Sequence, residues 1–220
     1  MRFAGLLFDF DGVLIESEYL GNKHIADYLT GIGHPTTPEQ SMANFMGYAG
    51  QDFIDRLEAY IGRALPPDYY TAREAEDARV MAAGIGEVAG AVDFVRSLPA
   101  RLPKAVVSSS STRWIRRHLD HIGLGGAFGD HLYSGREHVA RGKPAPDLYL
   151  YATERLGVAI TNCAIIEDSP VGATGAVASG GHVIGLTAGN HCGPDHAERL
   201  REIGVAAVAS SFEQVAALLA

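Results

Sequence analysis

The sequence predicts an α/β fold, a doubly wound parallel sheet into which an α-helical cap is inserted. Three observations predict this fold class. Short apolar segments without period-two alternation recur along the chain, as is typical of strands buried on both faces. Helical patterns alternate with these segments over most of the chain. Between residues 16 and 86, by contrast, the patterns are only helical, which indicates an insert after the first strand.

The first element is a buried strand over residues 3–8, and the helical block follows it directly. Prolines punctuate the block: Pro38 after Thr37 and Asp68 after Pro67 are typical helix starts. We expect the cap domain to comprise residues 16–86, and the core domain residues 1–15 and 87–220. The helical patterns within the cap cover residues 18–33, 37–47, 50–65 and 67–83.

Strand–helix alternation resumes after the cap and continues to the last residue. The strand segments are short and apolar, whereas the helical segments carry apolar residues at three- and four-residue spacing. Strands are expected at residues 104–108, 130–135, 163–168, 182–189 and 205–210, and helices at residues 91–99, 111–124, 145–158, 170–180 and 212–220.

The chain has 220 residues, of which 47% are hydrophobic and 20% charged, as is typical of a folded globular protein. Its net charge of −8 repels nucleic-acid phosphates and anionic lipid, so we expect neither as a partner. No apolar run reaches the roughly 18 residues of a membrane helix, and the N-terminus lacks the pattern of a signal peptide. Cys163 and Cys192 cannot form a disulfide framework, so a reducing cytoplasm is the expected location. We expect a monomer or a weak dimer.

Polar residues lie at four points that the predicted topology brings to one edge of the sheet. Asp9 and Asp11 follow the first strand, and a run of serines begins at Ser108, where another strand ends. Ligands of doubly wound sheets bind at this edge, outside the carboxyl ends of the strands. The remaining groups are Lys143, just before a helix, and the pair Glu167 and Asp168 at the end of a further strand.

Each of these groups alone has an ordinary structural explanation. An aspartate after a strand commonly forms a turn, a serine run caps a helix, and a lysine before proline is usually a solvated loop residue. A single active site explains all four groups at once. Carboxylates at one edge repel one another unless a cation lies among them, and oxygen ligands without His or Cys favour Mg²⁺. Together with a lysine and a serine at a helix N-terminus, they suit a phosphoryl group.

Four segments, in this order, resemble the motifs of the haloacid dehalogenase (HAD) superfamily: DFDGVLIESE, VVSSSS, GKPAPD and IIEDSPVG. The helical block after the first motif resembles the cap of the α-capped subfamily, which includes β-phosphoglucomutases and 6-phosphogluconate phosphatases. The resemblance covers essentially the whole chain. It implies a Rossmann-like core and Mg²⁺ as the cofactor.

The resemblance implies a role for each matching residue. Asp9 is expected to be the nucleophile that becomes an aspartyl-phosphate. Asp11 is expected to protonate the leaving oxygen and then to activate water. Ser108 and Ser109 are expected to bind the phosphoryl oxygens, and Lys143 to neutralise charge. The implied Mg²⁺ ligands are Asp9, the main-chain carbonyl of Asp11, Asp168 and, directly or through water, Glu167.

Differences within the superfamily favour a phosphatase. Dehalogenases lack the second aspartate, which is present here as Asp11. Phosphonatases carry a cap lysine near the segment FMGYAGQD, whereas the only cap lysine here is Lys23, in the first cap helix. Mutases place a histidine and an arginine where Gly21 and Gly50 stand, so a sugar-phosphate mutase is the weaker alternative. The expected substrate is a small phosphate monoester, a sugar or sugar-acid phosphate. The expected specificity contacts are Glu18, Asn22, Tyr48 and Gln51.

Three further interpretations concern residues or functions outside these motifs. Trp114 lies among arginines, which we interpret as an amphipathic helix in which the indole packs, not as a nucleic-acid site. The histidines, among them His118, His191 and His196, match no zinc-binding spacing and are interpreted as solvated surface residues. A non-enzymatic phospho-receiver also uses acids, Mg²⁺, Ser/Thr and Lys, but its acid pair follows the first strand and it has no cap.

Overall fold

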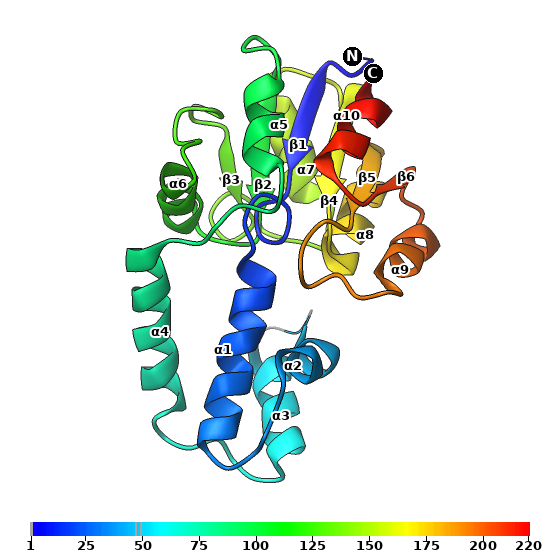
Figure 1. Ribbon diagram of the computed structural model, residues 1–220. Coiled ribbons are helices and arrows are strands. Elements are labelled where there is room, and N and C mark those ends of the chain that lie inside the picture. The colour runs from blue at the N-terminus through cyan, green and yellow to red at the C-terminus, as the bar shows by residue number, and fades with distance from the viewer. Residues whose placement is uncertain (1, 47, 49) are drawn as a thin grey trace. The chain divides into compact units, whose positions relative to one another are not determined.

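A computed structural model describes residues 2–46, 48 and 50–220. Within them, six parallel strands form one sheet in the order β3-β2-β1-β4-β5-β6 (Figure 1). The chain starts near the middle of the sheet at β1, runs outward to β3, returns to β4 and runs outward again to β6. This is the doubly wound arrangement, and it confirms the fold class predicted from the sequence.

Each strand lies within its predicted segment; β2 has the predicted bounds, and the other strands are shorter than predicted. They are β1 Gly5–Phe8, β2 Lys104–Ser108, β3 Leu132–Ser134, β4 Cys163–Glu167, β5 His182–Leu186 and β6 Ala207–Ala209. The helices that accompany them are α5 Ala91–Ser97, α6 Thr112–His121, α7 Asp147–Leu156, α8 Pro170–Ala178, α9 His196–Ile203 and α10 Phe212–Leu219, with the 3-10 turn η1 Ile160–Asn162. Of the six α-helices, α9 was not predicted from the sequence.

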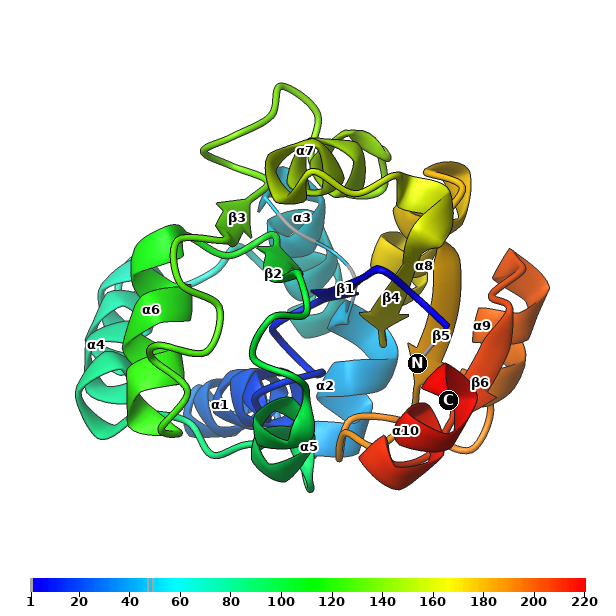
Figure 2. The same ribbon diagram turned by 90° about the horizontal axis from the view of Figure 1, so that it is seen from above.

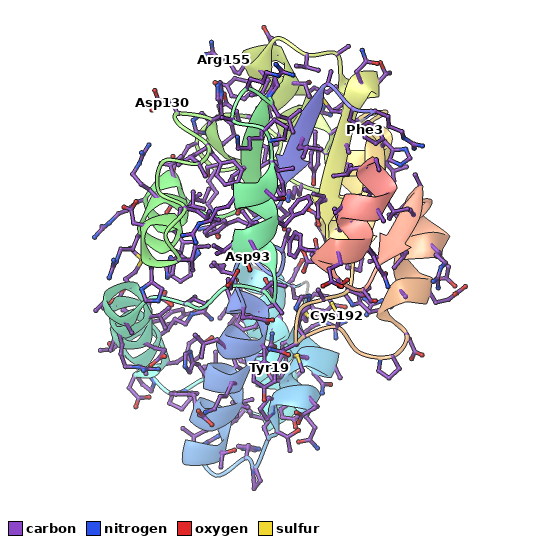
Figure 3. All side chains as sticks on the ribbon, turned by 45° about the horizontal axis from the view of Figure 1, so that its top comes forward. Phe3, Tyr19, Asp93, Asp130, Arg155 and Cys192 are labelled. Atoms are coloured by element: carbon purple, nitrogen blue, oxygen red, sulfur yellow. The ribbon has the colours of Figure 1, made fainter. Side chains whose placement is uncertain are left out.

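Helices cover both faces of the sheet, α7 and α8 on one and α5 and α10 on the other (Figure 2). Side chains fill the layers between (Figure 3). Successive residues of a strand point to opposite faces. Leu7 therefore packs in a cluster with Tyr149 of α7, whereas the ring of Phe8 lies against Phe94 of α5. The ring of Phe94 in turn packs against Phe212 of α10. Burial on both faces explains why β1 is apolar without alternation.

The chain divides into two compact units. The sheet unit comprises Met1–Glu16 and Ile85–Ala220, and the helical unit comprises Ser17–Gly84. These limits lie within two residues of the boundaries expected from the sequence, 15/16 and 86/87. Among the described residues, no helix has the length and apolar character that crossing a bilayer requires.

The helical unit has its own small core. Thr37 opens α2 with a capping box, because its hydroxyl accepts the N–H of Gln40 at 3.2 Å while Oε1 of Gln40 accepts the N–H of Thr37 at 2.9 Å. Gly47 and Ala49, in the segment compared with phosphonatases, lie outside the described residues. The helices are α1 Ser17–Gly31, α2 Pro38–Phe45, α3 Gly50–Ile61 and α4 Tyr69–Ala83. The buried cluster contains Leu29, Phe45, Leu57, Ile61 and Tyr69.

Candidate active site

The polar ends of three strands come together because β1 lies between β2 and β4. Phe8, the last residue of β1, pairs with Ile166 of β4, so Asp9 lies beside Glu167. Ser108 ends β2 on the other side of β1. The N–H of Asp9 donates to the carbonyl oxygen of Ile166 at 2.9 Å, which fixes the start of the loop after β1. The structure thus brings together strand ends that are far apart in the sequence.

The loop after β1 turns at Gly12, whose φ of 78° lies in the left-handed region. A Cβ atom at this position would overlap Oδ2 of Asp168. Glycine therefore serves both the backbone conformation of the loop and its close approach to the carboxylate after β4.

Lys143 is the buried cation of the site. Its Nζ lies 2.8 Å from Oδ1 of Asp9 and 2.5 Å from Oε1 of Glu167, and its side chain is 4% exposed. Burial by itself would lower the pKa of Lys143, but the carboxylates of Asp9 and Glu167 raise this pKa well above its usual value. Lys143 therefore stays protonated between the two acids.

One cation does not balance the buried acids. Burial, and then the negative charge of Glu167, raises the pKa of Asp9 and of Asp168 well above their usual values. Ligand oxygens of Asp9, Glu167 and Asp168 lie within 4.8 Å of one another, a grouping that could hold a metal ion. Oδ1 of Asp168 is buried and has no hydrogen-bond partner among the described residues. Hard oxygen donors with an orphaned carboxylate oxygen fit Mg²⁺.

Glu167 is held by donors on both of its carboxylate oxygens. Besides Lys143, the hydroxyl of Tyr149 donates to Oε1 at 3.0 Å, and the N–H of Ser169 donates to Oε2 at 3.0 Å. The side chain is completely buried. These contacts show that Glu167 fixes the position of the Lys143 ammonium, whatever its part in holding a metal.

Asp11 points to a different set of partners. The hydroxyls of Ser110 and Ser108 donate to its Oδ2 at 2.7 and 3.2 Å, and the indole N–H of Trp114 donates to its Oδ1 at 3.2 Å. Asp11 and Asp9 are two residues apart, yet their carboxylates have different hydrogen-bond environments. That separation suits two different chemical tasks.

His191 and His196 are buried against Asp168, so the interpretation of these histidines as surface residues is wrong. They are 4% and 3% exposed, and His118 is completely buried. Nε2 of His191 donates to Oδ2 of Asp168 at 2.8 Å, and Nε2 of His196 donates to the main-chain oxygen of Asp168 at 2.5 Å. Sequence reasoning misplaced these residues because the loop after β5 folds back to β4, which no local pattern indicates.

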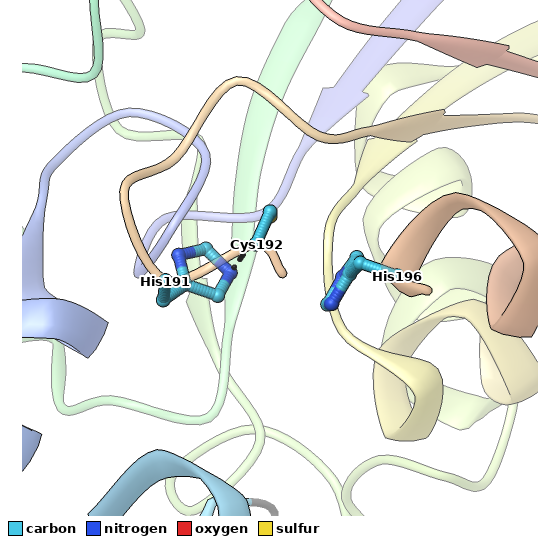
Figure 4. Close-up of side chains that lie close together, drawn as sticks. All are labelled: His191, Cys192 and His196. Atoms are coloured by element: carbon cyan, nitrogen blue, oxygen red, sulfur yellow. Dashed lines mark hydrogen bonds between the residues drawn. The ribbon is translucent and has the colours of Figure 1, made fainter. Parts of the chain in front are cut away.

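His191, Cys192 and His196 lie together on the loop after β5 and at the start of α9 (Figure 4). Their ligand atoms lie within 4.8 Å of one another, a grouping that could also hold a metal ion, and Cys192 forms no disulfide. Nε2 of His191 lies 3.4 Å from Sγ of Cys192. The contacts of both histidines with Asp168 already account for their orientation.

The structure leaves the expected specificity residues as predictions and shows only their local contacts. Asn22 is buried within the helical unit, where its amide donates to the main-chain oxygen of Glu18 and accepts the hydroxyl of Ser41. Gln51 donates to Asp55 at 2.7 Å. Tyr48 is 43% exposed, and the guanidinium of Arg56 lies over its ring. Ser109, in the sheet unit, is exposed.

Sequence reasoning missed several residues that contact the site. Ser110 is within the serine run and could have been included with its neighbours. Trp114 and Tyr149 are on helices, and only the register of each helix against its strand shows which side chain reaches an acid. His191 carries no signal in the sequence that would place it beside Asp168.

Comparisons with known proteins show which family the chain is similar to. The family model of haloacid dehalogenase-like hydrolases matches residues 3–180. Hexitol phosphatase A of Escherichia coli is 31% identical over 217 residues, which cover 98% of this chain and 94% of that protein. The 6-phosphogluconate phosphatase of the same species is 26% identical over 194 residues, covering 88% of this chain and 86% of that protein.

A solved structure is similar over nearly the whole chain. The HAD family hydrolase from Deinococcus radiodurans, with bound phosphate and sodium, has a TM-score of 0.88 and 32% identity, and the match covers 99% of this chain and 95% of that one. The chain therefore belongs to the haloacid dehalogenase-like hydrolases, and it is a phosphatase. This membership overturns the alternative of a non-enzymatic phospho-receiver.

Proposed function

We propose that the protein is a Mg²⁺-dependent phosphatase that hydrolyses a small phosphate monoester, a sugar or sugar-acid phosphate, through an aspartyl-phosphate on Asp9. The observation that carries this proposal is the contact between Asp9 and Lys143. The ammonium holds Oδ1 at 2.8 Å in a buried site, which orients the carboxylate and leaves Oδ2 as the oxygen to attack phosphorus.

The proposed reaction has two steps. In the first, an oxygen of Asp9 bonds to phosphorus as the bond to the ester oxygen breaks, and Asp11 gives that oxygen its proton. In the second, Asp11 takes a proton from a water molecule, whose oxygen bonds to phosphorus and releases Asp9. Ser108, at the end of β2, and the exposed Ser109 would donate to the phosphoryl oxygens, and Lys143 would neutralise part of their charge.

Asp9, Asp168, the main-chain carbonyl of Asp11 and, directly or through water, Glu167 would hold Mg²⁺. When bound, Mg²⁺ would offset the negative charge of the carboxylates and of the phosphoryl group. The raised pKa values of Asp9 and Asp168 and the orphaned oxygen of Asp168 support this cation.

The names of the relatives support the substrate class, because one names a hexitol, which is a sugar alcohol, and the other names 6-phosphogluconate, which is a sugar-acid phosphate. We propose that the helical unit is the cap that limits the access of water during phosphoryl transfer. Tyr48, Gln51 and Glu18 stay candidate contacts for the sugar. Asn22 stays one too, although its amide is already bonded within the unit. The cytoplasmic location stays a prediction.

The test is phosphate release from a panel of sugar, sugar-acid, nucleotide and glycolytic phosphates, with Mg²⁺ and with chelator. We expect Mg²⁺-dependent release with a preference for sugar-type esters. Asp9→Asn should reduce release by at least about 10³-fold, as loss of a nucleophile commonly does. Asp93→Asn, an exposed aspartate on α5, is the matched control and should keep wild-type turnover. A folded Asp9→Asn variant with wild-type turnover would show that Asp9 is not the nucleophile.

The reaction product distinguishes a sugar-phosphate mutase from a phosphatase. With a bisphosphate primer, a mutase yields an isomer of the sugar phosphate, whereas a phosphatase yields free phosphate. We expect free phosphate, because glycines stand at the two positions where the resemblance places cationic mutase residues.

A further inference from the structure

Trp114 is the only tryptophan of the chain, and it contacts the acid that is expected to transfer protons. Its indole N–H donates to Oδ1 of Asp11 at 3.2 Å. The other oxygen, Oδ2, accepts the hydroxyls of Ser110 and Ser108. The two oxygens of one carboxylate thus have different kinds of donor.

We propose that Trp114 is a positioning residue for proton transfer: it anchors Oδ1 of Asp11, so that Oδ2 exchanges the proton with the leaving oxygen and then with water. This inference rests on the proposed phosphatase function and adds a residue outside the four motifs.

The indole is itself held in place by α6. The main-chain N–H of Trp114 donates to Oγ of Ser111, the N-cap residue of α6, at 3.3 Å, which fixes the backbone that carries the indole. One turn later, the ring of His118 packs on the indole with 4.1 Å between centroids, and its Nδ1 donates to the main-chain oxygen of Trp114 at 2.9 Å. Burial lowers the pKa of His118, so this ring stays neutral at pH 7. The anchor on Oδ1 therefore has a fixed direction.

The hydroxyl donors on Oδ2 differ from the indole N–H on Oδ1 because a hydroxyl can rotate. A serine hydroxyl rotates about its C–O bond and has one proton, so it cannot donate to Asp11 and to a phosphoryl oxygen at once. Ser108 is the proposed phosphoryl ligand, and a bound phosphoryl group would draw its hydroxyl away from Oδ2. The indole N–H is fixed in its ring and keeps Oδ1. Binding of the substrate would thereby remove the weaker of the two hydroxyl donors from the oxygen that must react, while Ser110 could still donate to it at 2.7 Å.

The chemistry of the step makes the anchor testable. As the bond between phosphorus and the ester oxygen breaks, the O–H of Asp11 breaks, its proton moves to the ester oxygen, and Asp11 is left as a carboxylate. An alkyl ester such as a sugar phosphate needs this proton, because an alkoxide is a poor leaving group. A nitrophenolate leaves without a proton. A defect in the anchor should therefore affect the two substrate classes unequally.

The experiment compares Trp114→Phe with the wild type, using kcat/KM for the preferred sugar phosphate and for p-nitrophenyl phosphate. This quantity reports the first chemical step and not the later hydrolysis of the phosphoenzyme. We expect kcat/KM for the sugar phosphate to fall by about 10- to 100-fold, part of what a general acid supplies. For p-nitrophenyl phosphate we expect a change below about threefold. Arg113→Ala, an exposed neighbour on α6, should change neither value.

Asp11→Asn gives the reference pattern, a larger loss with the same selectivity for the sugar phosphate. Equal losses of Trp114→Phe on both substrates, or no loss on either, would overturn the anchor. If the wild type hydrolysed neither substrate, the proposed function would fail instead, and the contact would still be tested by fluorescence.

Emission from the single tryptophan reports the contact without catalysis. We expect Asp11→Ala to shift or change the emission of Trp114 in the folded protein, with Asp11→Ser as a second variant. Arg113→Ala should leave emission unchanged. Unchanged emission in both folded Asp11 variants would show that the indole does not bond to Asp11, and the proposal would be wrong.

Discussion

Lys143 shows how one residue decides the electrostatics of the site. Removing a single partner from a buried group of charges is costly, because the remaining charges lose their compensation. Lys143→Met keeps the aliphatic chain and removes the ammonium from between Asp9 and Glu167. We expect the free energy of unfolding without Mg²⁺ to fall by about 3 kcal/mol, measured by denaturant titration. Phosphate release should fall by at least about 10²-fold.

Lys104→Met is the control for that substitution. Lys104 begins β2, and burial lowers its pKa, but its ammonium forms no ion pair with a described carboxylate. This variant should lose little stability and keep its activity. Equal effects of the two substitutions on phosphate release would contradict the role of Lys143 in the site.

His191 is expected to act on the metal through Asp168. Residues that orient a metal ligand typically contribute 10- to 100-fold to metal affinity. His191→Ala removes the donor from Oδ2 of Asp168, so we expect the Mg²⁺ concentration for half-maximal activity to rise by about tenfold or more. At saturating Mg²⁺, kcat should recover most of its value. His121→Ala, an exposed histidine of α6, should leave the Mg²⁺ dependence unchanged, and a shift there as large as that of His191→Ala would refute the argument.

The residues that sequence reasoning could place are those at strand ends. Asp9, Ser108 and Glu167 follow apolar segments, and parallel topology then brings them to one edge. Their roles in catalysis and metal binding stay predictions. Trp114 and His191 could not be placed, because the distance from each to its acid depends on helix register and on a loop that returns across the sheet. The local pattern of apolar and polar residues indicates neither the register of a helix nor the path of a loop.

At the scale of elements, the approach of α8 to the rest of the site depends on glycines. A Cβ on Gly175 would lie 2.8 Å from the main-chain oxygen of Ala145 and 2.9 Å from that of Pro144, in the loop that carries Lys143. Backbone atoms cannot turn aside as a side chain can. We expect Gly175→Ala to destabilise the protein by about 1–3 kcal/mol and to lower activity by displacing Lys143.

The measurement is denaturant unfolding alongside phosphate release. Gly126→Ala is the matched control in the same unit, since a Cβ there meets nothing within 4 Å. It should stay within about 0.5 kcal/mol of the wild type. A Gly175→Ala variant as stable and active as Gly126→Ala would mean that α8 can shift without cost.

Most helices and strands were predictable because their apolar pattern matches the residues that are buried, or because their ends carry helix-start residues. Strand β4 is buried throughout and apolar up to its last residue, Glu167, and α2 has a proline at its start and a capping box. Helix α9 was missed for the opposite reason. It follows a loop, its N-cap residue Asp195 makes no side-chain cap, and only His196 and Leu200 are buried. With so narrow an apolar face, its sequence resembles a polar loop.

At the scale of the molecule, the change from strand–helix alternation to purely helical patterns between residues 16 and 86 indicated two units. The structure divides the chain within two residues of the expected positions. The type of sheet, parallel and doubly wound, could be predicted, because apolar strands that alternate with helices have few possible arrangements. The loop after β5 could not be predicted. It brings His191 to Asp168 at the end of β4, and its sequence has no hydrophobic repeat that would indicate this path.

The stability of the whole molecule should couple pH to Mg²⁺. The folded-state pKa values of Asp9 and Asp168 are raised by burial and by Glu167, so the folded protein without metal binds protons that the unfolded chain has released. Between the unfolded value near 3.8 and the higher folded values, the contribution of these groups to the unfolding free energy therefore falls as pH rises. Bound Mg²⁺ would hold the carboxylates ionised and remove this loss.

We therefore expect Mg²⁺ to raise the free energy of unfolding, and the difference between Mg²⁺ and chelator to grow as pH rises above 3.8, the value of the unfolded carboxylates. At a hundredfold excess over its dissociation constant, Mg²⁺ should add about 2.7 kcal/mol. His118 has the opposite pH dependence, because burial lowers its pKa, and its contribution should be the same with and without metal, so it cancels in the difference. Denaturant titrations at several pH values measure it. In Asp168→Asn the difference should nearly vanish, and a difference that is independent of pH would show that these carboxylates do not hold the cation.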